Sequence, residues 1–500
     1  MESTSTTSSS GSSTIDLESQ SQIKMEVDSL SEVHNRVMTL SQKVTWDCGI
    51  IDTKHHPMNM PLWKKLFITI INCSMAMITM MSISLMTPAI TTICAEFGVS
   101  LEVGALTYGM YVLGWAIAPM ILSPLSDIWG RRYFYVFSWI LFIITFVACA
   151  LAPNMACLLV FRFLAGLAGS PAIALNAGTL TDIWEGESRG RAIGIVVIVS
   201  YLGPVLAPII GGYIVQYLSW KWTLWLTPII AGAVLLPVIW CPETHAPTIL
   251  EKQVKKERKR SKNMHLHAEG ARTINFSVIR KAVAKPFQLL FTEPIIMGVS
   301  MYIAVLSGIL YLYFGAYPYV FRRIYKLSIG DSSLAFLGLV IGCLAAVPAV
   351  LIMAKQYRKL KATGSGAPED SLRWAIWAAL LLPVGPFILG WTSKKDISYF
   401  VPACGGIVFG FSSLILIVAF YTYLSEAYDT AHAGSVFAGI LFVRSIVTAG
   451  FPVAMPKMYD NLGVNWASST LGFILIAIAW VPAGLFRYGE RYRRRSPFAA

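Results

Sequence analysis

The chain has 500 residues, of which 55% are apolar and only 13% are charged, and its formal net charge is +13. A soluble domain carries about 25% charged residues, so this composition excludes an ordinary soluble protein and indicates one that uses a lipid bilayer as its solvent. The positive charge does not indicate a nucleic-acid binder, because the charges lie between long apolar stretches.

The first 60 residues open with the Ser/Thr-rich stretch MESTSTTSSSGSST. A secretory signal peptide would have a basic segment followed by an apolar one, and this tail has neither. We interpret residues 1–60 as a disordered cytosolic tail.

Twelve apolar stretches follow, each near the ~20 residues that a helix needs to cross ~30 Å of hydrocarbon. They cover residues 66–90, 103–125, 133–151, 157–180, 190–215, 222–240, 288–314, 333–353, 373–391, 399–424, 432–456 and 468–487. The predicted fold is an all-α membrane protein with twelve transmembrane helices in two six-helix halves. The halves cover 61–240 and 288–487, joined by a basic cytosolic loop at 241–287 and followed by a basic cytosolic tail at 488–500.

Lys and Arg are unevenly shared between alternate connections. If both termini face the cytosol, 31 of the 40 lie in the tails and cytosolic connections, seven lie in outer connections, and Arg162 and Arg444 lie within spans. Positive charge concentrates on the cytosolic side of membrane proteins, so we predict a multi-pass protein with both termini in the cytosol. The basic stretch at 251–262 fits this rule or a contact with anionic lipid, and a nuclear signal is the less favoured alternative.

A charged motif connects the second and third stretches. It reads Ser123-Pro-Leu-Ser-Asp127-Ile-Trp-Gly130-Arg131-Arg132. The spacing predicts a tight turn at Gly130 with Asp127 and Arg131 on either side of it. Asp182 ends the fourth stretch on the same predicted side, so we expect Arg131 to lie between two carboxylates as a cytosolic latch. The alternative is that these residues only set the topology.

The fourth stretch contains Leu158-Leu-Val-Phe-Arg162-Phe-Leu-Ala-Gly166. An arginine inside a span costs ~2.5–3.5 kcal/mol, so Arg162 indicates either a functional buried cation or a side chain that reaches the membrane surface.

The fifth stretch contains a pattern of small residues, Gly194-x8-Gly203-x3-Ala207-Pro208-x2-Gly211-Gly212. Small residues let two helices approach closely, and proline bends a helix. We expect this helix to pack on the eighth stretch, where Gly338 and Gly342 form a G-x-x-x-G pattern.

These patterns resemble three motifs of the major facilitator superfamily, G-x-x-x-D-x-x-G-R-R/K, R-x-x-x-G and G-x8-G-x3-G-P-x2-G-G, with Ser123 and Ala207 as departures. Further similarities lie at Glu293-Pro294, Tyr421-Thr-Tyr-Leu-Ser-Glu426-Ala-Tyr428, Leu441-Phe-Val-Arg444-Ser and Met458-Tyr-Asp-Asn-Leu-Gly-Val-Asn-Trp. Together they resemble the fungal branch of the twelve-span drug:proton antiporter family over residues 60–490.

The resemblance implies a transporter and not an enzyme. It implies export of a drug, polyamine, secondary metabolite or organic acid in exchange for protons, because the fifth-stretch pattern is associated with antiporters. No cofactor or metal is expected, and we expect a monomer in the plasma membrane, with the vacuolar membrane as the alternative.

In this fold the substrate lies near the midplane between the two halves, so polar and aromatic side chains within the spans are the binding candidates. They are Tyr111, Trp115, Asn176, Tyr201, Tyr302, Tyr311 and Phe409. The alternative is that Tyr and Trp near span ends are interfacial anchors. The coupling candidates are Arg162, Arg444, Glu293 and Glu426, and no acidic residue lies at the centre of a span.

Other functions fit less well. An uptake or facilitated-diffusion carrier for a nutrient shares the topology, but the fifth-stretch pattern argues against it. A membrane-embedded enzyme is disfavoured because neither H-E-x-x-H nor G-x-S-x-G occurs. A seven-span receptor does not fit twelve stretches, and no Walker lysine motif indicates ATP as the energy source.

Overall fold

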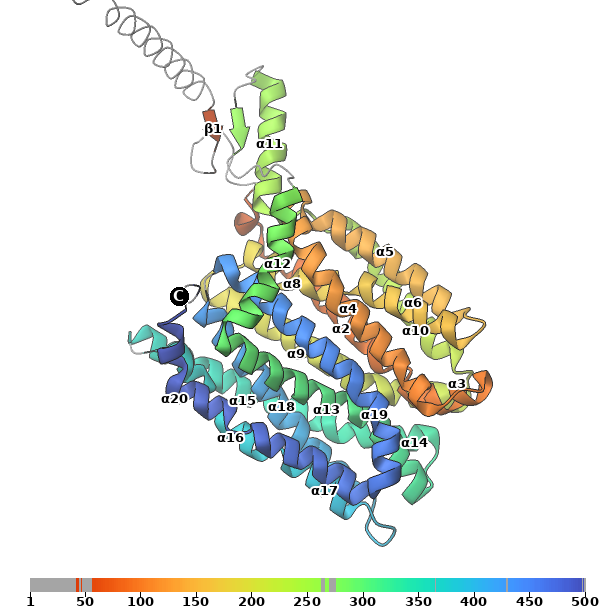
Figure 1. The fold of residues 1–500 in the computed structure, drawn as a ribbon. Coiled ribbons are helices and arrows are strands. Elements are labelled where there is room, and N and C mark those ends of the chain that lie inside the picture. The colour runs from red at the N-terminus through yellow and green to blue at the C-terminus, as the bar shows by residue number, and fades with distance from the viewer. Residues whose placement is uncertain are drawn as a thin grey trace, which may run out of the picture. The chain divides into compact units, whose positions relative to one another are not determined.

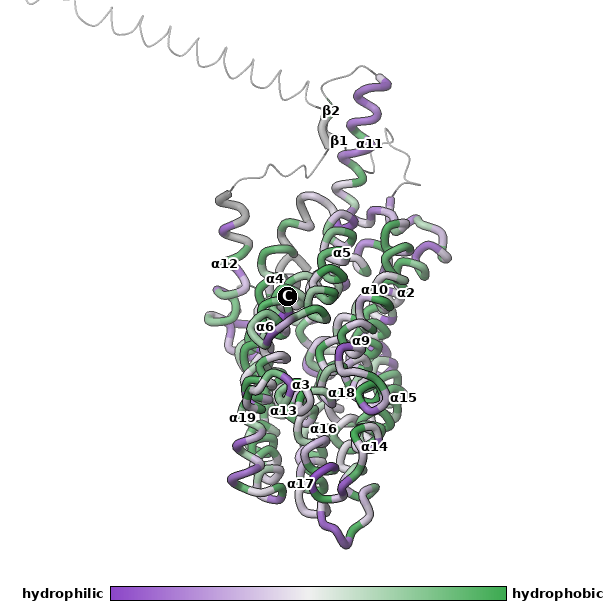
Figure 2. The backbone as a smooth tube through the Cα atoms, turned by 90° about the vertical axis from the view of Figure 1, so that its right-hand side faces the viewer, coloured by the Kyte–Doolittle hydropathy of each residue, from purple (hydrophilic) through white to green (hydrophobic). Residues whose placement is uncertain are grey.

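The computed structural model describes residues 42–44, 46, 56–261, 266–268, 276–364, 366–428, 430–496 and 498. They belong to two compact units, one drawn from Met1–Asn59 and Ala246–Thr273, the other from Met60–His245 and Ile274–Ala500. The first unit contains β1 (Gln42–Val44), η2 (Pro57–Asn59), α11 (Ala246–Ser261) and β2 (Leu266–Ala268). β1 and β2 pair in parallel, with Gln42 opposite Leu266. Figure 2 shows that α11 is largely hydrophilic.

The membrane body is the second unit, a bundle of helices (Figure 1). Its N-terminal half contains α2 (Leu62–Ser84), η3 (Thr87–Ala89), α3 (Ile90–Phe97), α4 (Leu101–Trp129), α5 (Arg131–Ala150), α6 (Met155–Gly169), α7 (Pro171–Ala174), α8 (Asn176–Ile183), α9 (Gly186–Tyr217) and α10 (Lys221–Trp240). After α12 (Phe276–Thr292), the C-terminal half contains α13 (Pro294–Tyr325), α14 (Ile329–Ser333), η4 (Leu334–Phe336), α15 (Leu337–Ala362), η5 (Pro368–Leu372), α16 (Arg373–Leu381), α17 (Val384–Thr392), α18 (Phe400–Ala427), α19 (Thr430–Ile478) and α20 (Val481–Arg493).

Among the described residues, eleven helical segments are long and apolar enough to cross a membrane, which confirms the predicted all-α membrane fold. The last of them, Gly434–Arg493, has 60 residues. A straight helix of that length would be about 90 Å long, three times the ~30 Å hydrocarbon core. Gly463 interrupts it with a φ of 71°. This segment therefore has room for two crossings, and the predicted twelfth span depends on that break.

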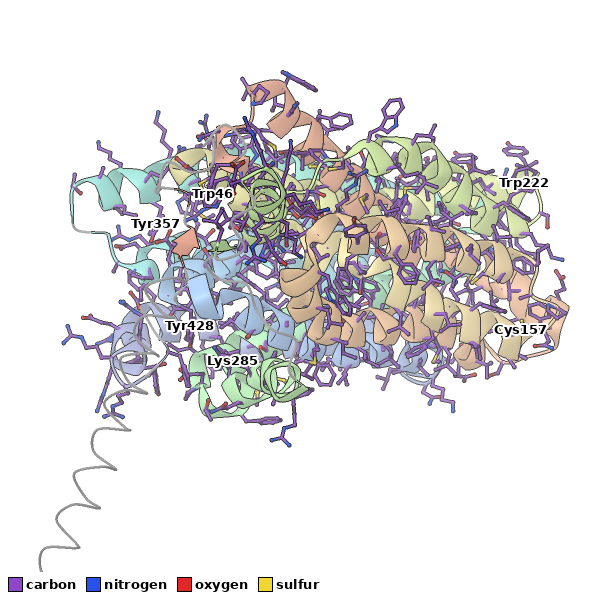
Figure 3. All side chains as sticks on the ribbon, turned by 90° about the horizontal axis from the view of Figure 1, so that it is seen from above. Trp46, Cys157, Trp222, Lys285, Tyr357 and Tyr428 are labelled. Carbon is purple, nitrogen blue, oxygen red and sulfur yellow. The ribbon has the colours of Figure 1, made fainter. Side chains whose placement is uncertain are left out.

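The helices run between two ends of the bundle. We call the end with the connections near residues 130, 184, 364 and 428 the predicted cytosolic end. The end with the connections near residues 99, 153, 219, 327 and 395 is the predicted outer end. Figure 3 shows Cys157 and Trp222 at the predicted outer end, with Tyr357 and Tyr428 at the opposite end.

Local sequence explains where several helices begin and end. The Ser100 side chain accepts a hydrogen bond from the Val103 N–H at the start of α4, and the Asn154 side chain does the same for the Cys157 N–H at the start of α6. Such caps satisfy N–H groups that have no partner within the helix. Gly130, with a φ of 93°, separates α4 from α5, so the turn predicted there is present.

Helix α9 packs on α2 through small residues. An added Cβ at Gly203 would lie 2.9 Å from the Met77 carbonyl oxygen, and one at Gly211 would overlap the Leu85 carbonyl oxygen. Ala207, between them, is fully buried beside Leu85. The two backbones are therefore in direct contact, as small residues in a membrane helix allow.

A proline within α9 is compensated by α2. Pro208 has no N–H to donate to the carbonyl of Pro204, one helical turn earlier. The Ser84 hydroxyl of α2 donates to this carbonyl at 2.6 Å. The bond satisfies a backbone group that would be costly to leave unpaired in a bilayer.

Helix α9 packs on the eighth span as expected, but Gly338 and Gly342 are not part of that contact. Gly212 does meet that span, because an added Cβ would overlap the Ser333 hydroxyl on α14. Gly338 and Gly342 instead face α18, where an added Cβ would overlap the carbonyl oxygens of Ala403 and Ile407. Small residues allow close approach to any helix, so the pattern alone could not name the partner.

Candidate functional site

A charged cluster lies at the predicted cytosolic end of the N-terminal half. Arg131, the first residue of α5, places its Nε 2.6 Å from Asp182 Oδ2, and both side chains are largely buried. Gly178 leaves room for this pair, because an added Cβ would overlap the Arg131 guanidinium. The predicted pairing of Arg131 with Asp182 is therefore present. Asp127 belongs to α4, and its side chain lies outside the described part of the structure.

Glu243 is part of the same cluster and was missed from the sequence. Its carboxylate accepts the backbone N–H groups of Arg131 at 3.0 Å and Arg132 at 3.3 Å. A carboxylate at this position satisfies the first N–H groups of α5 and interacts favourably with its helix dipole. The Arg132 side chain donates to the Ile239 carbonyl at 2.8 Å. The only sequence signal was an acidic residue directly after the sixth apolar stretch.

The C-terminal half carries a corresponding ion pair. Lys361, at the end of α15, lies 2.5 Å from Glu426, near the end of α18. Lys361 lies at the end of the second span of its half, and Glu426 lies at the end of the fourth. Arg131 and Asp182 hold the corresponding places in the N-terminal half. Glu426 is thus at the predicted cytosolic end and not at the midplane. Glu293, before α13, is also at that end, where it accepts the hydroxyl groups of Ser496 at 2.8 Å and Tyr428 at 3.3 Å.

Arg162 lies inside the N-terminal half and does not reach the membrane surface. Its side chain is 1% exposed and donates from Nη1 to the Ser82 carbonyl at 2.9 Å. Nη2 lies 3.0 Å from the sulfur of Met86. The guanidinium carbon lies 6.0 Å from the ring centroid of Tyr111 and 5.4 Å from that of Phe146. These contacts hold a cation among aromatic rings, as cation–π interactions favour.

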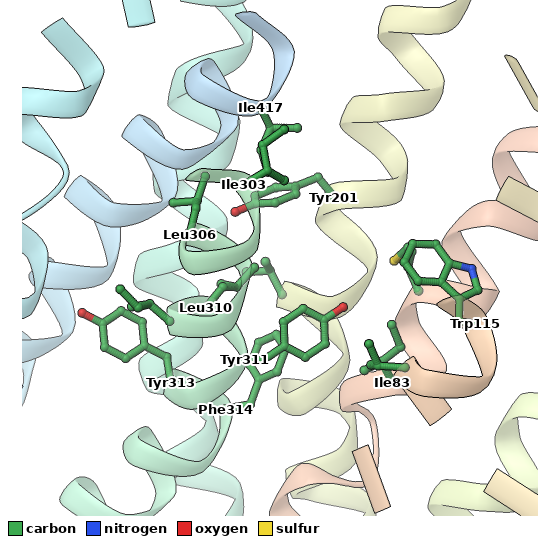
Figure 4. Close-up of a cluster of buried hydrophobic side chains, with 14 of the residues drawn as sticks. Ile83, Trp115, Tyr201, Ile303, Leu306, Leu310, Tyr311, Tyr313, Phe314 and Ile417 are labelled. Carbon is green, nitrogen blue, oxygen red and sulfur yellow. The ribbon is translucent and has the colours of Figure 1, made fainter. Parts of the chain in front are cut away.

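Arg444, on α19, lies at the boundary between the halves. Its guanidinium carbon is 5.9 Å from the ring centroid of Trp115, on α4 of the other half. Tyr311 and Tyr421 lie beside the guanidinium, and Tyr201 interacts with it electrostatically. Figure 4 shows that Trp115, Tyr201 and Tyr311 come from three different helices, and that the Tyr311 hydroxyl points toward Trp115.

The structure thus brings together three of the seven binding candidates around Arg444, and it places Tyr111 beside Arg162. Sequence reasoning missed Tyr421 as a neighbour of Arg444, because it lies in the last turns of its span, where tyrosine is commonly an interfacial anchor.

The remaining binding candidates contact residues of their own half. The Asn176 side chain donates to the Asn72 carbonyl at 3.4 Å. Tyr302 packs against Phe420 with ring centroids 4.9 Å apart. Phe409 packs edge-on against Tyr313 at 5.0 Å.

A cavity of about 500 Å³ lies at the predicted outer end, lined by α3 and α4 of one half and by α13 and α19 of the other. Arg322, Arg323 and Lys326 line it, so its wall is basic. Arg323 pairs with Asp460 at 2.7 Å, and Arg322 donates to the Thr91 hydroxyl at 3.1 Å. This volume falls in the range of small-molecule pockets.

Comparison with known proteins places the chain in a family. The sequence profile of the Major Facilitator Superfamily matches residues 73–452. The ascochitine biosynthesis cluster MFS transporter of Didymella fabae is 34% identical, over 90% of this chain and 88% of its own length. The citrinin biosynthesis cluster MFS transporter mrr1 of Monascus ruber is 36% identical, over 89% of this chain and 90% of its own length.

Solved structures show the same fold. The xylose transporter XylE from E. coli, in a partially occluded inward-open conformation, has a TM-score of 0.63 at 14% identity, covering 85% of this chain and 98% of its own. The human organic anion transporter MFSD10 has a TM-score of 0.57 at 14% identity, covering 85% of this chain and all of its own. The helical membrane body, the profile match and these full-length relatives together show that the chain belongs to the Major Facilitator Superfamily of membrane transporters.

Proposed function

We propose that this protein exports a small organic molecule of the secondary-metabolite type, as a monomer in the plasma membrane, in exchange for protons. The fungal relatives that support this are named as transporters of the ascochitine and citrinin biosynthesis clusters. The cargo binds near the midplane, beside Arg444 and Trp115 at the boundary of the two halves.

The geometry of α9 is the observation that supports export as the direction of transport. Gly203 and Gly211 bring α9 into backbone contact with α2, and Gly212 brings it against Ser333 of the opposite half. The same helix carries the pattern that resembles the antiporter motif. In this proposal the two halves rotate relative to each other about the contact between Gly212 and Ser333, at the predicted outer end.

The charged pairs at the predicted cytosolic end act as latches in this proposal. Arg131 with Asp182, and Lys361 with Glu426, each tie the end of one span to the end of another in the same half. Rigid-body transitions of this kind repack interfaces between two discrete arrangements. The pairs keep each half rigid, so that each half moves as one body when cargo enters from the cytosol.

Efflux from loaded cells tests the proposal. The test compound is the metabolite that accumulates in cells lacking the protein, supplied in labelled form. Cells with the protein should release it faster than cells without it, and a protonophore should remove most of the difference. Net uptake of the compound by energised cells would contradict export. Efflux that persists with the protonophore would contradict proton exchange but not export.

A further inference from the structure

The interior of the membrane body has an unbalanced charge. Arg162 is 1% exposed and Arg444 is 9% exposed, and both lie within spans. Every Asp and Glu of the described helical body lies near a span end or in a connection, and neither arginine forms an ion pair with a carboxylate there. Removing a cation from water is costly unless an anion accompanies it. The described residues therefore supply no anion to Arg444 where the two halves meet.

Three groups around this position can only donate hydrogen bonds. They are the guanidinium of Arg444, the indole N–H of Trp115 and the Nε–H of Arg162, since neither arginine nor tryptophan has an acceptor atom. The Trp115 Nε1 and Arg162 Nε atoms are buried and have no hydrogen-bond partner. A ligand that satisfies them must supply acceptors, and a carboxylate or phenolate does so with the charge that the guanidinium requires.

The surrounding rings define the shape of the ligand. Tyr111 and Trp115 lie four residues apart on α4 and hence on one face of it. Each ring faces one arginine, Tyr111 beside Arg162 and Trp115 beside Arg444. Tyr201, from α9, adds a further ring within electrostatic reach of Arg444, and aromatic surroundings favour a flat, conjugated ligand.

We propose that the boundary between the halves binds an aromatic organic anion, with Arg444 as the partner of its carboxylate or phenolate. The inference rests on the proposed transport function and narrows its cargo. A polyamine or cationic drug carries positive charge and mainly donors, so two guanidinium groups would repel it. The basic wall formed by Arg322, Arg323 and Lys326 at the predicted outer end suits the same anion on its way out.

Equilibrium binding to the purified full-length protein in detergent tests this class of cargo without any gradient. The probes are 1-naphthoate and 1-naphthylmethylammonium, which share a ring system and differ in charge. Wild-type protein should bind the anion at least tenfold more tightly than the cation. Arg444→Gln should weaken anion binding about tenfold or more, and Arg444→Lys should recover part of it. Arg487→Gln, which removes an exposed arginine of α20, is the control for net charge and should bind like wild type.

The preference of the wild-type protein for the anion over the cation tests the inference even if Arg444→Gln fails to fold. Equal or tighter binding of the cation, or undiminished anion binding by folded Arg444→Gln, would overturn it. Displacement of the probe by millimolar chloride alone would show an inorganic-anion site and would also overturn it. Anion binding without net efflux from cells would contradict the export direction and leave the cargo class standing. Efflux of a cargo that is not an anion would contradict the cargo class and leave the export direction standing.

Discussion

Arg162 is the residue whose surroundings most constrain its role. Two of its nitrogens contact the Ser82 carbonyl and the Met86 sulfur, and both neighbours belong to the region where α2 ends. The side chain therefore links α6 to α2 within the membrane, besides supplying charge.

We expect Arg162→Ala to abolish transport and Arg162→Lys to retain part of it. A lysine keeps the charge but has one nitrogen, so it lacks the planar fork by which two nitrogens of Arg162 reach the Ser82 carbonyl and the Met86 sulfur. A hydrogen bond to a charged group is worth ~1.5–3 kcal/mol, so the alanine variant should lose more than tenfold in rate. Efflux rates at matched protein levels in the membrane measure this effect. Wild-type efflux by the alanine variant would mean that the charge has no role in transport.

Gly178 shows how the absence of a side chain positions a charged one. The space beside it is filled by the Arg131 guanidinium, which reaches Asp182. Gly178→Ala should displace Arg131 and weaken this ion pair. Since the pair is neither fully exposed nor fully buried, we expect a loss of about 1–3 kcal/mol of stability.

Thermal unfolding of the purified variant, together with its efflux rate, measures the effect of Gly178→Ala. Gly190→Ala is the matched control, because an added Cβ there meets nothing within 4 Å. If Gly178→Ala and the control have equal melting temperatures, the Arg131 guanidinium can shift without a loss of stability.

At the scale of the element, α9 combines two kinds of glycine in one motif. Gly203, Gly211 and Gly212 touch neighbouring helices, whereas an added Cβ at Gly194 would meet nothing within 4 Å. The motif is therefore not uniform, and its packing role is confined to the part nearer the predicted outer end.

Gly211→Leu should abolish efflux while the protein still reaches the membrane. The new side chain cannot fit beside the Leu85 carbonyl unless α9 moves away from α2. Gly194→Leu, on the same helix, should transport normally. Comparing efflux by the two variants at equal surface levels isolates close packing from helix propensity, because both replace glycine in a helix with leucine. Equal activity of the two variants would remove the argument from α9 for export.

At the scale of the whole molecule, two halves meet along α4 and α19, where Trp115 faces Arg444. A cargo held there must cross the electric field of the membrane in either direction. If the cargo is an anion, an inside-negative potential favours its export by ~2.3 kcal/mol per charge per 100 mV, which is nearly fiftyfold in concentration.

Export of 1-naphthoate should therefore accelerate when the potential is made more negative on the loaded side. Proteoliposomes with the potential set by potassium and valinomycin, at equal pH on both sides, provide the measurement. Protein-free liposomes are the control, because even a neutral cargo exchanged for a proton would move charge, and they should show no potential-dependent release of 1-naphthoate. Transport of the anion at a rate independent of potential would show that another charge moves with it and cancels its own.

Much of this architecture follows from local properties of the sequence. Span positions depend on hydropathy, and predicted sidedness depends on where Lys and Arg occur, because the bilayer acts on each segment separately. The turn at Gly130 follows from one residue that tolerates a φ of 93°. The pairing of Arg131 with Asp182 could be predicted from the order of span ends, since each connection returns the chain to a known side.

Other features depend on how the helices rotate and which neighbours they meet. Glu243 caps α5 from more than a hundred residues away, Gly338 and Gly342 face α18 and not α9, and Arg444 gathers rings from four helices. Hydropathy cannot predict these contacts, because in a bilayer an apolar helix face has lipid and several protein neighbours as equally apolar partners. The sequence by itself determined a two-ended bundle of helices with arginines inside it, and only the tertiary structure decided what surrounds those arginines.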